Sequence, residues 1–192
     1  AIRSKKIDIV ILTSDSDKIL DLTNHKKIIK IKRKKNLCKD NTPMLPVILN
    51  AVQYYEKNFK KKISKVVLFD PTAPLRKPED ISRSIAIFDK KKPDLLISVH
   101  DSDHNPYFSM LEKKDKYFRL PKYSGKNPGS RQSVPKVFDI NTLVWIYSKK
   151  AIVKIKKRVP NKTIIFQTDI ERSIDIDTEN DIKRIKYYLK KK

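Results

Sequence analysis

Short runs of apolar residues alternate along the chain with segments in which apolar side chains recur every three to four residues. A β-branched run such as residues 8–12 is typical of a buried strand, and the helical spacing that follows Pro43 predicts one buried helix face. Strands are predicted at residues 8–12, 27–31, 66–69, 94–99, 107–111, 117–120, 143–147, 164–166 and 173–176. One helix is predicted after the capping residues 13–17, and two others begin at Pro43 and Pro78. A basic helix follows the strand 143–147 and ends at about residue 158, and the last helix lies around residues 182–189.

This alternation predicts a single α/β domain over residues 1–192, with a mostly parallel sheet covered by helices on both faces. In such sheets, ligands bind beyond the carboxyl ends of the strands. That rule selects Ser14 with Asp15, the loop 70–76, and residues 175–177. The irregular stretch 100–135 interrupts the pattern, so it is the best candidate for an insertion with a task of its own.

The formal net charge is +23, from 45 Lys and Arg residues against 22 Asp and Glu residues. Such an excess fits nucleic-acid binding. Only nine of the cations are Arg, however, and no Lys run forms a stripe along one helix. We therefore favour a solvated basic surface that attracts an anionic substrate.

No apolar run approaches the roughly 18 residues that cross a bilayer, no secretion leader is evident, and the lone Cys38 suits a reducing compartment. A cytoplasmic protein is expected.

Asp175 and Asp177 lie two residues apart in the predicted strand 173–176 and its end. Residues at this spacing point to the same side of a strand, which leaves Ile174 and Ile176 for the core. Two neighbouring carboxylates repel each other unless a divalent cation lies between them, and Mg²⁺ with a phosphate-bearing substrate suits such a pair. The alternative is that Asp177 or Thr178 caps a helix while Asp175 is merely exposed.

Two further segments carry candidate chemistry. The loop 70–76 contains two prolines that fix its path, so it is either a ligand-binding loop or a stiff connection. Arg131 and Gln132 lie in a Gly/Pro/Ser-rich loop, where a guanidinium could bind a carboxylate or phosphate through two hydrogen bonds, or simply face solvent.

With two glycines in the whole chain, no Gly-rich nucleotide loop is present, and three scattered histidines do not supply a zinc site.

Taken in order, these segments resemble the acylneuraminate cytidylyltransferases, also called CMP-sialic acid synthetases. The matching stretches are residues 11–15 (ILTSD), 67–76 (VLFDPTAPLR), 104–106 (HNP), 131–135 (RQSVP), 141–147 (NTLVWIY) and 171–178 (ERSIDIDT). The resemblance covers essentially the whole chain, and the motifs at 71–76 and 172–178 are quite specific when they occur together.

The resemblance implies a fold like that of the nucleotide-diphospho-sugar transferases and a reaction between CTP and a nonulosonic (sialic-type) acid. It places Mg²⁺ on Asp175 and Asp177, which with Arg131 would form the catalytic set, Arg131 contacting the sugar. The implied substrate-binding residues are Asp70, His104, Arg131, Gln132, Asn141 and Trp145. The implied nucleotide-binding residues are Asp15, Arg33, Asp40, Asn41 and Thr42. Stretch 100–135 resembles the insertion through which the family forms homodimers.

Several positions depart from the family pattern. The family's opening strand and its Ala-Arg-x-x-Ser-Lys-Gly loop, which cradles the triphosphate, have no counterpart here, so we expect an N-terminally incomplete domain that holds CTP weakly. Asp70 stands where many members have Gln, Trp145 where Tyr is usual, and Phe108 where sialic-acid users carry Lys. Legionaminic or pseudaminic acid is therefore as plausible a substrate as N-acetylneuraminic acid. The alternatives are a nucleotidyltransferase for another sugar or base, and a non-catalytic basic module that binds nucleic acid.

Overall fold

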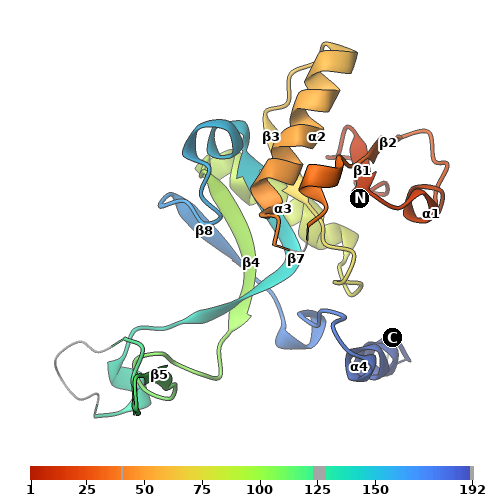
Figure 1. Cartoon of the computed structure of the whole chain (residues 1–192). Coiled ribbons are helices and arrows are strands. Elements are labelled where there is room, and N and C mark those ends of the chain that lie inside the picture. Colours follow the sequence, from red (N-terminus) through yellow and green to blue (C-terminus); the bar gives the residue numbers. More distant parts are fainter. Residues whose placement is uncertain (40, 123–128, 191–192) are drawn as a thin grey trace.

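Three sheets and four α-helices make up the computed structural model, which describes residues 1–39, 41–122 and 129–190 (Figure 1). The central sheet has the strand order β3 (Lys65–Leu68), β7 (Phe138–Ser148), β4 (Leu95–Asp101) and β8 (Thr163–Gln167). Strands β1 (Val10–Ser14) and β2 (Ile28–Lys32) form a parallel pair, and β5 (Glu112–Lys114) with β6 (Tyr117–Arg119) forms a hairpin. The α-helices are α1 (Asp17–Leu20), α2 (Met44–Phe59), α3 (Pro78–Lys91) and α4 (Glu179–Lys190). Shorter helical turns are η1 (Lys35–Leu37), η2 (Arg131–Ser133), the π-helical η3 (Ala151–Ile155) and η4 (Ile170–Arg172).

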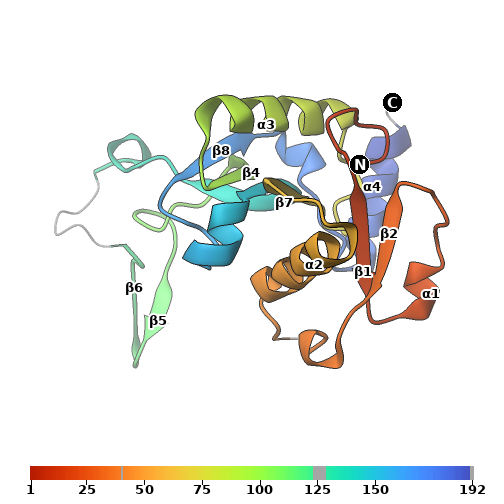
Figure 2. The ribbon, with the colours of Figure 1, turned by 90° about the horizontal axis from the view of Figure 1, so that it is seen from above.

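Alternating side chains of β4 and β7 build two hydrophobic layers, one on each face of the central sheet. Because successive strand residues point to opposite faces, Leu95 and Ile97 pack with α2, whereas Leu96 packs with α3. The layer under α2 contains Ile48, Val52, Leu95, Ile97, Val99, Trp145, Tyr147, Ala151 and Ile152. The layer under α3 contains Ile81, Ile85, Phe88, Leu96, Val144, Ile146 and Phe166. Figure 2 shows α2 and α3 on opposite sides of this sheet, so the predicted α/β class with helices on both faces is confirmed.

The direction of β7 differs from the mostly parallel sheet that the strand–helix alternation predicts. Strand β4 pairs in parallel with β8, but β7 runs antiparallel to both β3 and β4. The chain leaves β4 at Asp101, makes the excursion 100–135 and returns through Phe138, which is the register partner of Asp101. Because β7 begins beside the end of β4, without a crossover to the other end of the sheet, the two strands run antiparallel. The central sheet is therefore mixed, with β7 in its middle.

The excursion is organised by a buried polar residue rather than by the strand predicted at 107–111, which is wrong. Asn105 is 7% exposed, and its side-chain amide donates to the carbonyl oxygen of Pro135 (3.0 Å). The N–H of Tyr107 donates to the Asn105 side-chain oxygen (2.9 Å), and the N–H of Ser109 donates to its carbonyl oxygen (2.8 Å). Backbone groups bonded to Asn105 in this way are not available for a strand ladder. In Figure 1 the β5–β6 hairpin lies well away from the helices.

Two predictions near the C-terminus differ from the structure: one helix is shorter and one strand does not form. The basic helix expected up to about residue 158 ends at Ile155, because Lys156 takes a left-handed conformation (φ 54°) that closes the π-helical turn. Residues 173–176 do not form the predicted strand. No helix in the described part of the chain is long and apolar enough to cross a membrane.

Candidate active site

Arg76 ties the loop between β3 and α3 to strand β7. Its Nε donates to the carbonyl oxygen of Leu143, and its Nη2 donates to the carbonyl oxygens of Asp70 (3.0 Å) and Thr142 (3.1 Å). The guanidinium lies 4.8 Å from the centre of the Phe69 ring. Burial lowers the pKa of Arg76, while the carboxylates of Asp70, Asp175 and Asp80 oppose that shift. The loop therefore follows a fixed path, as its two prolines predict.

Two carboxylates and two threonine hydroxyls meet where this loop touches β7 and the C-terminal segment. Thr72 Oγ1 lies 2.9 Å from Asp70 Oδ1 and 3.2 Å from Asp175 Oδ1. Thr142 Oγ1 also donates to Asp175 Oδ1. A hydroxyl has one proton, so Thr72 serves one carboxylate at a time and Thr142 is the dedicated donor to Asp175. We call Asp70, Thr72, Thr142 and Asp175 the acidic cluster.

Asp175 reaches the cluster without the strand predicted at 173–176. The N–H of Ile176 donates to the carbonyl oxygen of Thr72 (2.9 Å), but Pro71 and Pro74 have no N–H, so the loop cannot extend this contact into a ladder. Ile174 and Ile176 still pack together with Leu75 and Ile185, as the alternation predicts. The C-terminal segment is thus placed by one hydrogen bond and by this small hydrophobic cluster.

Asp177 lies at the start of α4 and is exposed. Next to it, Thr178 and Asp181 cap the helix reciprocally: the N–H and hydroxyl of Thr178 donate to Asp181 Oδ2 (2.9 and 2.8 Å), and the N–H of Asp181 meets Thr178 Oγ1 (3.4 Å). The hydroxyl and N–H of Thr178 lower the pKa of Asp181. The alternative in which Thr178 caps a helix is therefore observed, and it leaves Asp175, not Asp177, inside the acidic cluster.

Only oxygen donors are present in the acidic cluster, which suits a hard cation such as Mg²⁺. In the part of the chain that the structure describes, no three His, Cys, Asp or Glu residues gather closely enough to form a metal site by themselves. Both hydrogen bonds found for Asp175 go to Oδ1. No described residue bonds to its Oδ2, which is therefore the atom that could serve as a ligand. The residues thus fit a cation that takes few protein ligands and receives the others from a substrate or water.

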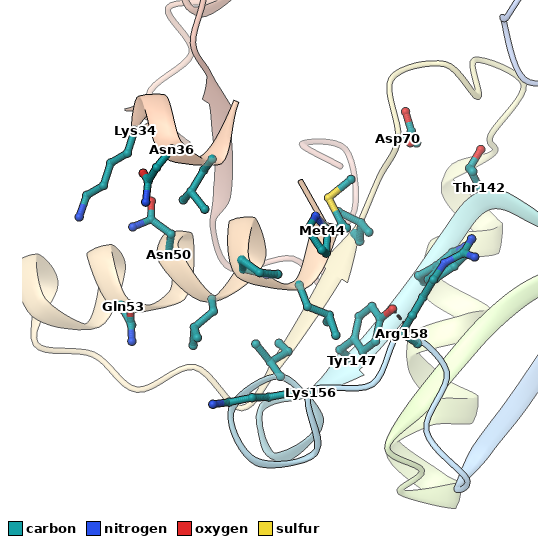
Figure 3. A pocket seen from close by; sticks show the side chains of 18 residues that line it. Lys34, Asn36, Met44, Asn50, Gln53, Asp70, Thr142, Tyr147, Lys156 and Arg158 are labelled. Carbon is teal, nitrogen blue, oxygen red and sulfur yellow. Dashed lines mark hydrogen bonds between the residues drawn. The ribbon is translucent and has the colours of Figure 1, made fainter. Parts of the chain in front are cut away.

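A pocket of about 830 Å³ lies beside the acidic cluster, between η1 and α2 on one side and β3, β7 and η3 on the other (Figure 3). Asp70 and Thr142 line it, so the acidic cluster forms one end of the pocket. The lining consists of Lys34, Asn36, Leu37, Pro43, Met44, Leu45, Pro46, Leu49, Asn50, Gln53, Leu68, Asp70, Thr142, Trp145, Tyr147, Ile152, Lys156 and Arg158. A cavity of this size, mostly apolar with a few polar groups, is typical of a small-molecule site.

Of the predicted substrate-binding residues, Asp70 and Trp145 line the pocket, whereas Asn141 does not. Asn141 is 2% exposed, and its side-chain amide donates to Thr168 Oγ1 and Ser173 Oγ (both 2.9 Å). Its carbonyl oxygen accepts the indole N–H of Trp145 (2.7 Å). Asn141 therefore holds β7, the end of β8 and the segment before Asp175 together, and it orients the Trp145 ring.

The predicted sugar contacts on the excursion lie outside this pocket. Arg131 and Gln132 are exposed in η2, and the Arg131 guanidinium donates to the carbonyl oxygen of Asp103. His104 is also exposed. Within one chain the structure does not bring these three residues together with Asp70, Trp145 or Asp175, and their assignment as sugar contacts stays a prediction.

Four of the predicted nucleotide-binding residues are described by the structure, and none of them lines the pocket. Arg33 donates through Nη2 to the carbonyl oxygen of Thr13 (2.9 Å), and its buried Nε has no hydrogen-bond partner among the described residues. Asp15 and Asn41 are exposed and Thr42 is half-buried. Asp40 lies outside the described residues. Residues that follow Arg33, namely Lys34, Asn36 and Leu37, form the wall instead.

Sequence reasoning missed most of the pocket lining and two members of the acidic cluster, and the missed polar residues include Thr72, Thr142, Lys156 and Arg158. The two threonines do lie inside the matching stretches 67–76 and 141–147, so their place beside carboxylates could have been suspected. Lys156 and Arg158 belong to a basic run that looks like ordinary surface, and nothing in their spacing points to a pocket.

Comparison with known proteins finds solved structures that share the fold and several sequence relatives. No family model matches the chain. Among solved structures, 4-diphosphocytidyl-2C-methyl-D-erythritol synthase from Anaerococcus prevotii aligns with a TM-score of 0.63 and 17% identity. The alignment covers 98% of this chain and 82% of that structure's chain. The CTP complex of CMP:2-keto-3-deoxy-manno-octonic acid synthetase (TM-score 0.62, 8% identity) covers 99% and 84%. The fold is therefore that of the cytidylyltransferases.

Sequence relatives narrow this class. Post-translational flagellin modification protein B of Campylobacter coli is 28% identical over 190 residues, which are 98% of this chain and 80% of the relative. CMP-N,N'-diacetyllegionaminic acid synthase of Campylobacter jejuni is 28% identical over 187 residues, or 97% and 79%. N-acylneuraminate cytidylyltransferase of Streptococcus agalactiae is 22% identical over 173 residues, or 90% and 40%. The chain is a homologue of the acylneuraminate cytidylyltransferases, which confirms the resemblance noted in its sequence.

Proposed function

We propose that this protein activates a nonulosonic acid with CTP and forms the CMP-sugar and pyrophosphate. The anomeric hydroxyl oxygen of the sugar acid attacks the α-phosphorus of CTP. The bond from that phosphorus to the oxygen bridging to the β-phosphate breaks, and the hydroxyl proton is lost to solvent or a base. The observation that carries this proposal is the acidic cluster at one end of a pocket of about 830 Å³, in a homologue of CMP-sugar acid synthases.

Asp175 and Asp177 would hold Mg²⁺, which would neutralise phosphate charge and orient the attacking hydroxyl. Thr142 and Thr72 hold Asp175 Oδ1, so Oδ2 would be the ligand atom. Arg76 keeps the loop of Asp70 against β7, so that the pocket end stays in one shape when ligands bind. Since CTP is made in the cytoplasm, we place the reaction there.

The function is tested by following pyrophosphate release with CTP, Mg²⁺ and a panel of N-acetylneuraminic, N,N'-diacetyllegionaminic, pseudaminic and 3-deoxy-manno-octulosonic acids. The assay uses this chain and the same reading frame extended upstream, because the expected triphosphate-binding loop has no counterpart in residues 1–192. We expect release with at least one acid in the form that binds CTP, and no comparable rate when ATP, GTP or UTP replaces CTP. No release by either folded form with any acid would contradict the proposal.

Replacing Thr142 with valine is expected to lower turnover about 10- to 100-fold, because the substitution removes the dedicated donor to Asp175 and keeps the side-chain shape. The Mg²⁺ concentration for half-maximal rate should rise as well, which a purely structural change would not cause. Thr163→Val in β8, whose hydroxyl donates to the carbonyl oxygen of Pro160 (2.5 Å), is the matched control. An unchanged Mg²⁺ dependence in Thr142→Val would remove the orienting role.

A homodimer formed through the excursion is also part of the proposal. The β5–β6 hairpin and the residue before it expose large apolar side chains: Leu111 is 67% exposed, Tyr117 69% and Phe118 63%. Side chains of this kind on a projecting hairpin are typical of a protein–protein interface. In a dimer, the excursion would carry Arg131 toward the pocket of the neighbouring copy, where it could contact the sugar acid.

Changing Tyr117 and Phe118 to serine is expected to convert the dimer into a monomer, which light scattering after gel filtration would measure. The control is Leu22→Ser, which removes an apolar side chain that is 82% exposed after α1, far along the chain from the hairpin. If the double variant stays dimeric, the interface lies elsewhere.

A further inference from the structure

Arg158 is held at the pocket wall by two contacts. Its guanidinium lies 5.2 Å from the centre of the Trp145 ring, and its carbonyl oxygen accepts the hydroxyl of Tyr147 (2.8 Å). Both aromatic residues are buried in the layer under α2, at 7% and 2% exposure. Burial raises the pKa of Tyr147 to about 12, so its hydroxyl keeps its proton and remains a donor at neutral pH. The backbone and the head of Arg158 are thus both positioned.

No carboxylate neutralises Arg158 among the described residues. Arg172 and Arg184 pair with acidic side chains and Arg76 binds carbonyl oxygens, whereas Arg158 forms no ion pair in that part of the chain. A guanidinium stacked on a ring still presents its N–H groups at its edge, where they can bind a carboxylate through two hydrogen bonds. Arg158 therefore has unused donors that border a cavity.

The other charges of the pocket reinforce this preference. Lys34 and Lys156 also line it and, within the described residues, form no ion pair, while Asp70 is the one acidic residue in the lining. Cations that border a mostly apolar cavity raise the local concentration of anions. The pocket is thus suited to a ligand with negative charge.

The wall that carries Arg158 has an unusual backbone. It consists of the π-helical turn η3, closed by the N–H of Lys156 on the carbonyl oxygen of Ala151 (2.9 Å), with Lys156 at φ 54°. Single π-helical turns are uncommon and are frequent at functional sites, whereas a left-handed lysine at the C-cap also ends α2 (Lys60) and α3 (Lys92). This backbone sets Lys156 and Arg158 on the rim of the same pocket.

The position of Arg158 indicates which group it binds. In Figure 3, Arg158 lies on the same side of the pocket as Thr142 and Asp70, whereas Lys34 lies on the opposite side. In a nonulosonic acid, the carboxylate is attached to the same carbon as the reacting hydroxyl. A residue that binds the carboxylate must therefore lie on the side of the acidic cluster.

We propose that Arg158, stacked on Trp145, binds the carboxylate of the sugar acid and makes the pocket selective for acidic sugars. This inference rests on the proposed function, whose reacting group sets the position of the carboxylate. The carboxylate is thus bound by a residue of the same chain that forms the pocket. Arg131 would then contact the sugar from the neighbouring copy.

Trp145 is the only tryptophan of the chain, so its fluorescence reports on this wall without any turnover. We would titrate the folded protein with N-acetylneuraminic and N,N'-diacetyllegionaminic acids, with the neutral C1 methyl ester of each, and separately with CTP. The wild type should respond saturably to at least one acid and bind its ester about 10- to 100-fold more weakly. Arg158→Gln should weaken the acid by a similar factor and leave the affinities for the ester and for CTP unchanged. Arg158→Lys should recover part of the acid affinity.

Arg83→Gln is the matched control, because Arg83 lies over the Phe166 ring at 5.8 Å on α3, outside the pocket. It should bind acid and ester like the wild type. Equal acid affinities in Arg158→Gln and the wild type would overturn the inference, as would the lack of any response of Trp145 to either acid. Arg158-dependent binding of an acid, combined with no pyrophosphate release from CTP, would support the inference while the proposed function fails.

Discussion

Replacing Asp175 with asparagine is expected to lower pyrophosphate release roughly 1000-fold or more while the protein stays folded. Asparagine keeps the shape of the side chain, and its amide oxygen can still accept the hydroxyls of Thr72 and Thr142. It lacks the negative charge that, in the proposed function, would hold Mg²⁺ against the phosphates, and transition-state charge stabilisation of this kind supplies several kcal/mol. The measurement is the steady-state rate in the form of the protein that turns over, together with a thermal melt.

Asp89→Asn serves as the control for this variant, because Asp89 is a surface carboxylate of α3 that pairs with Lys65. Its rate should stay within about twofold of the wild type, since exposed ion pairs contribute little. If Asp175→Asn retained more than about a tenth of the rate, the acidic cluster would not be the centre of the reaction, whatever the role of Asp177.

The second large effect is expected on stability, from Arg172→Met. Arg172 forms two hydrogen bonds with Asp80 (2.5 and 3.3 Å), and the two side chains are only 15% and 6% exposed. The hydrogen bond to Asp80 raises the pKa of Arg172 above its ordinary value, so Arg172 keeps its positive charge at neutral pH. Removing Arg172 leaves the buried Asp80 carboxylate without a counter-charge, with only the N–H of Lys77 (3.2 Å) as a hydrogen-bond donor, which costs about 3–5 kcal/mol. A decrease in melting temperature on the order of 10 °C should follow.

Two further variants separate charge from packing. Arg184→Met removes a cation that is 62% exposed and pairs with Asp181, so it should change the stability by less than about 1 kcal/mol. The double variant Asp80→Leu with Arg172→Met should recover most of the lost stability, because no unpaired charge is left inside. An Arg172→Met protein that melts with the wild type would show that Asp80 finds another partner.

The hydrophobic layers could be predicted from the sequence, but the course of the chain between strands could not. The period-two pattern of residues 95–99 and 143–147 already separates the side chains that pack with α2 from those that pack with α3. The same pattern reads identically in either strand direction, so it could not show that β7 is antiparallel to both neighbours. That direction follows from the excursion 100–135, whose turn depends on contacts of Asn105 with residues up to 30 positions away.

The acidic residues of the site were visible in the sequence, and the cationic ones were not. Asp70 and Asp175 follow apolar segments in specific motifs, and they do meet through Thr72. Arg131 attracted attention because it stands in a Gly/Pro/Ser-rich loop, whereas Arg158 stood in a basic run without any such signal. Local composition thus pointed to Arg131, which lies outside the pocket within one chain, and not to Arg158, which lines the pocket.

By itself, then, the sequence determined the alternation of strands and helices, the buried faces of β4, β7, α2 and α3, and the carboxylates Asp70 and Asp175. These features depend on side-chain period and on neighbours along the chain, which a sequence displays directly. Only the tertiary structure decided that η1 and η3, more than 100 residues apart, form the walls of one pocket, and that Arg158 lies on Trp145 beside the acidic cluster. Such contacts arise from how packed layers bring distant segments together, because burial of the shared apolar surface stabilises a particular arrangement that no local spacing records.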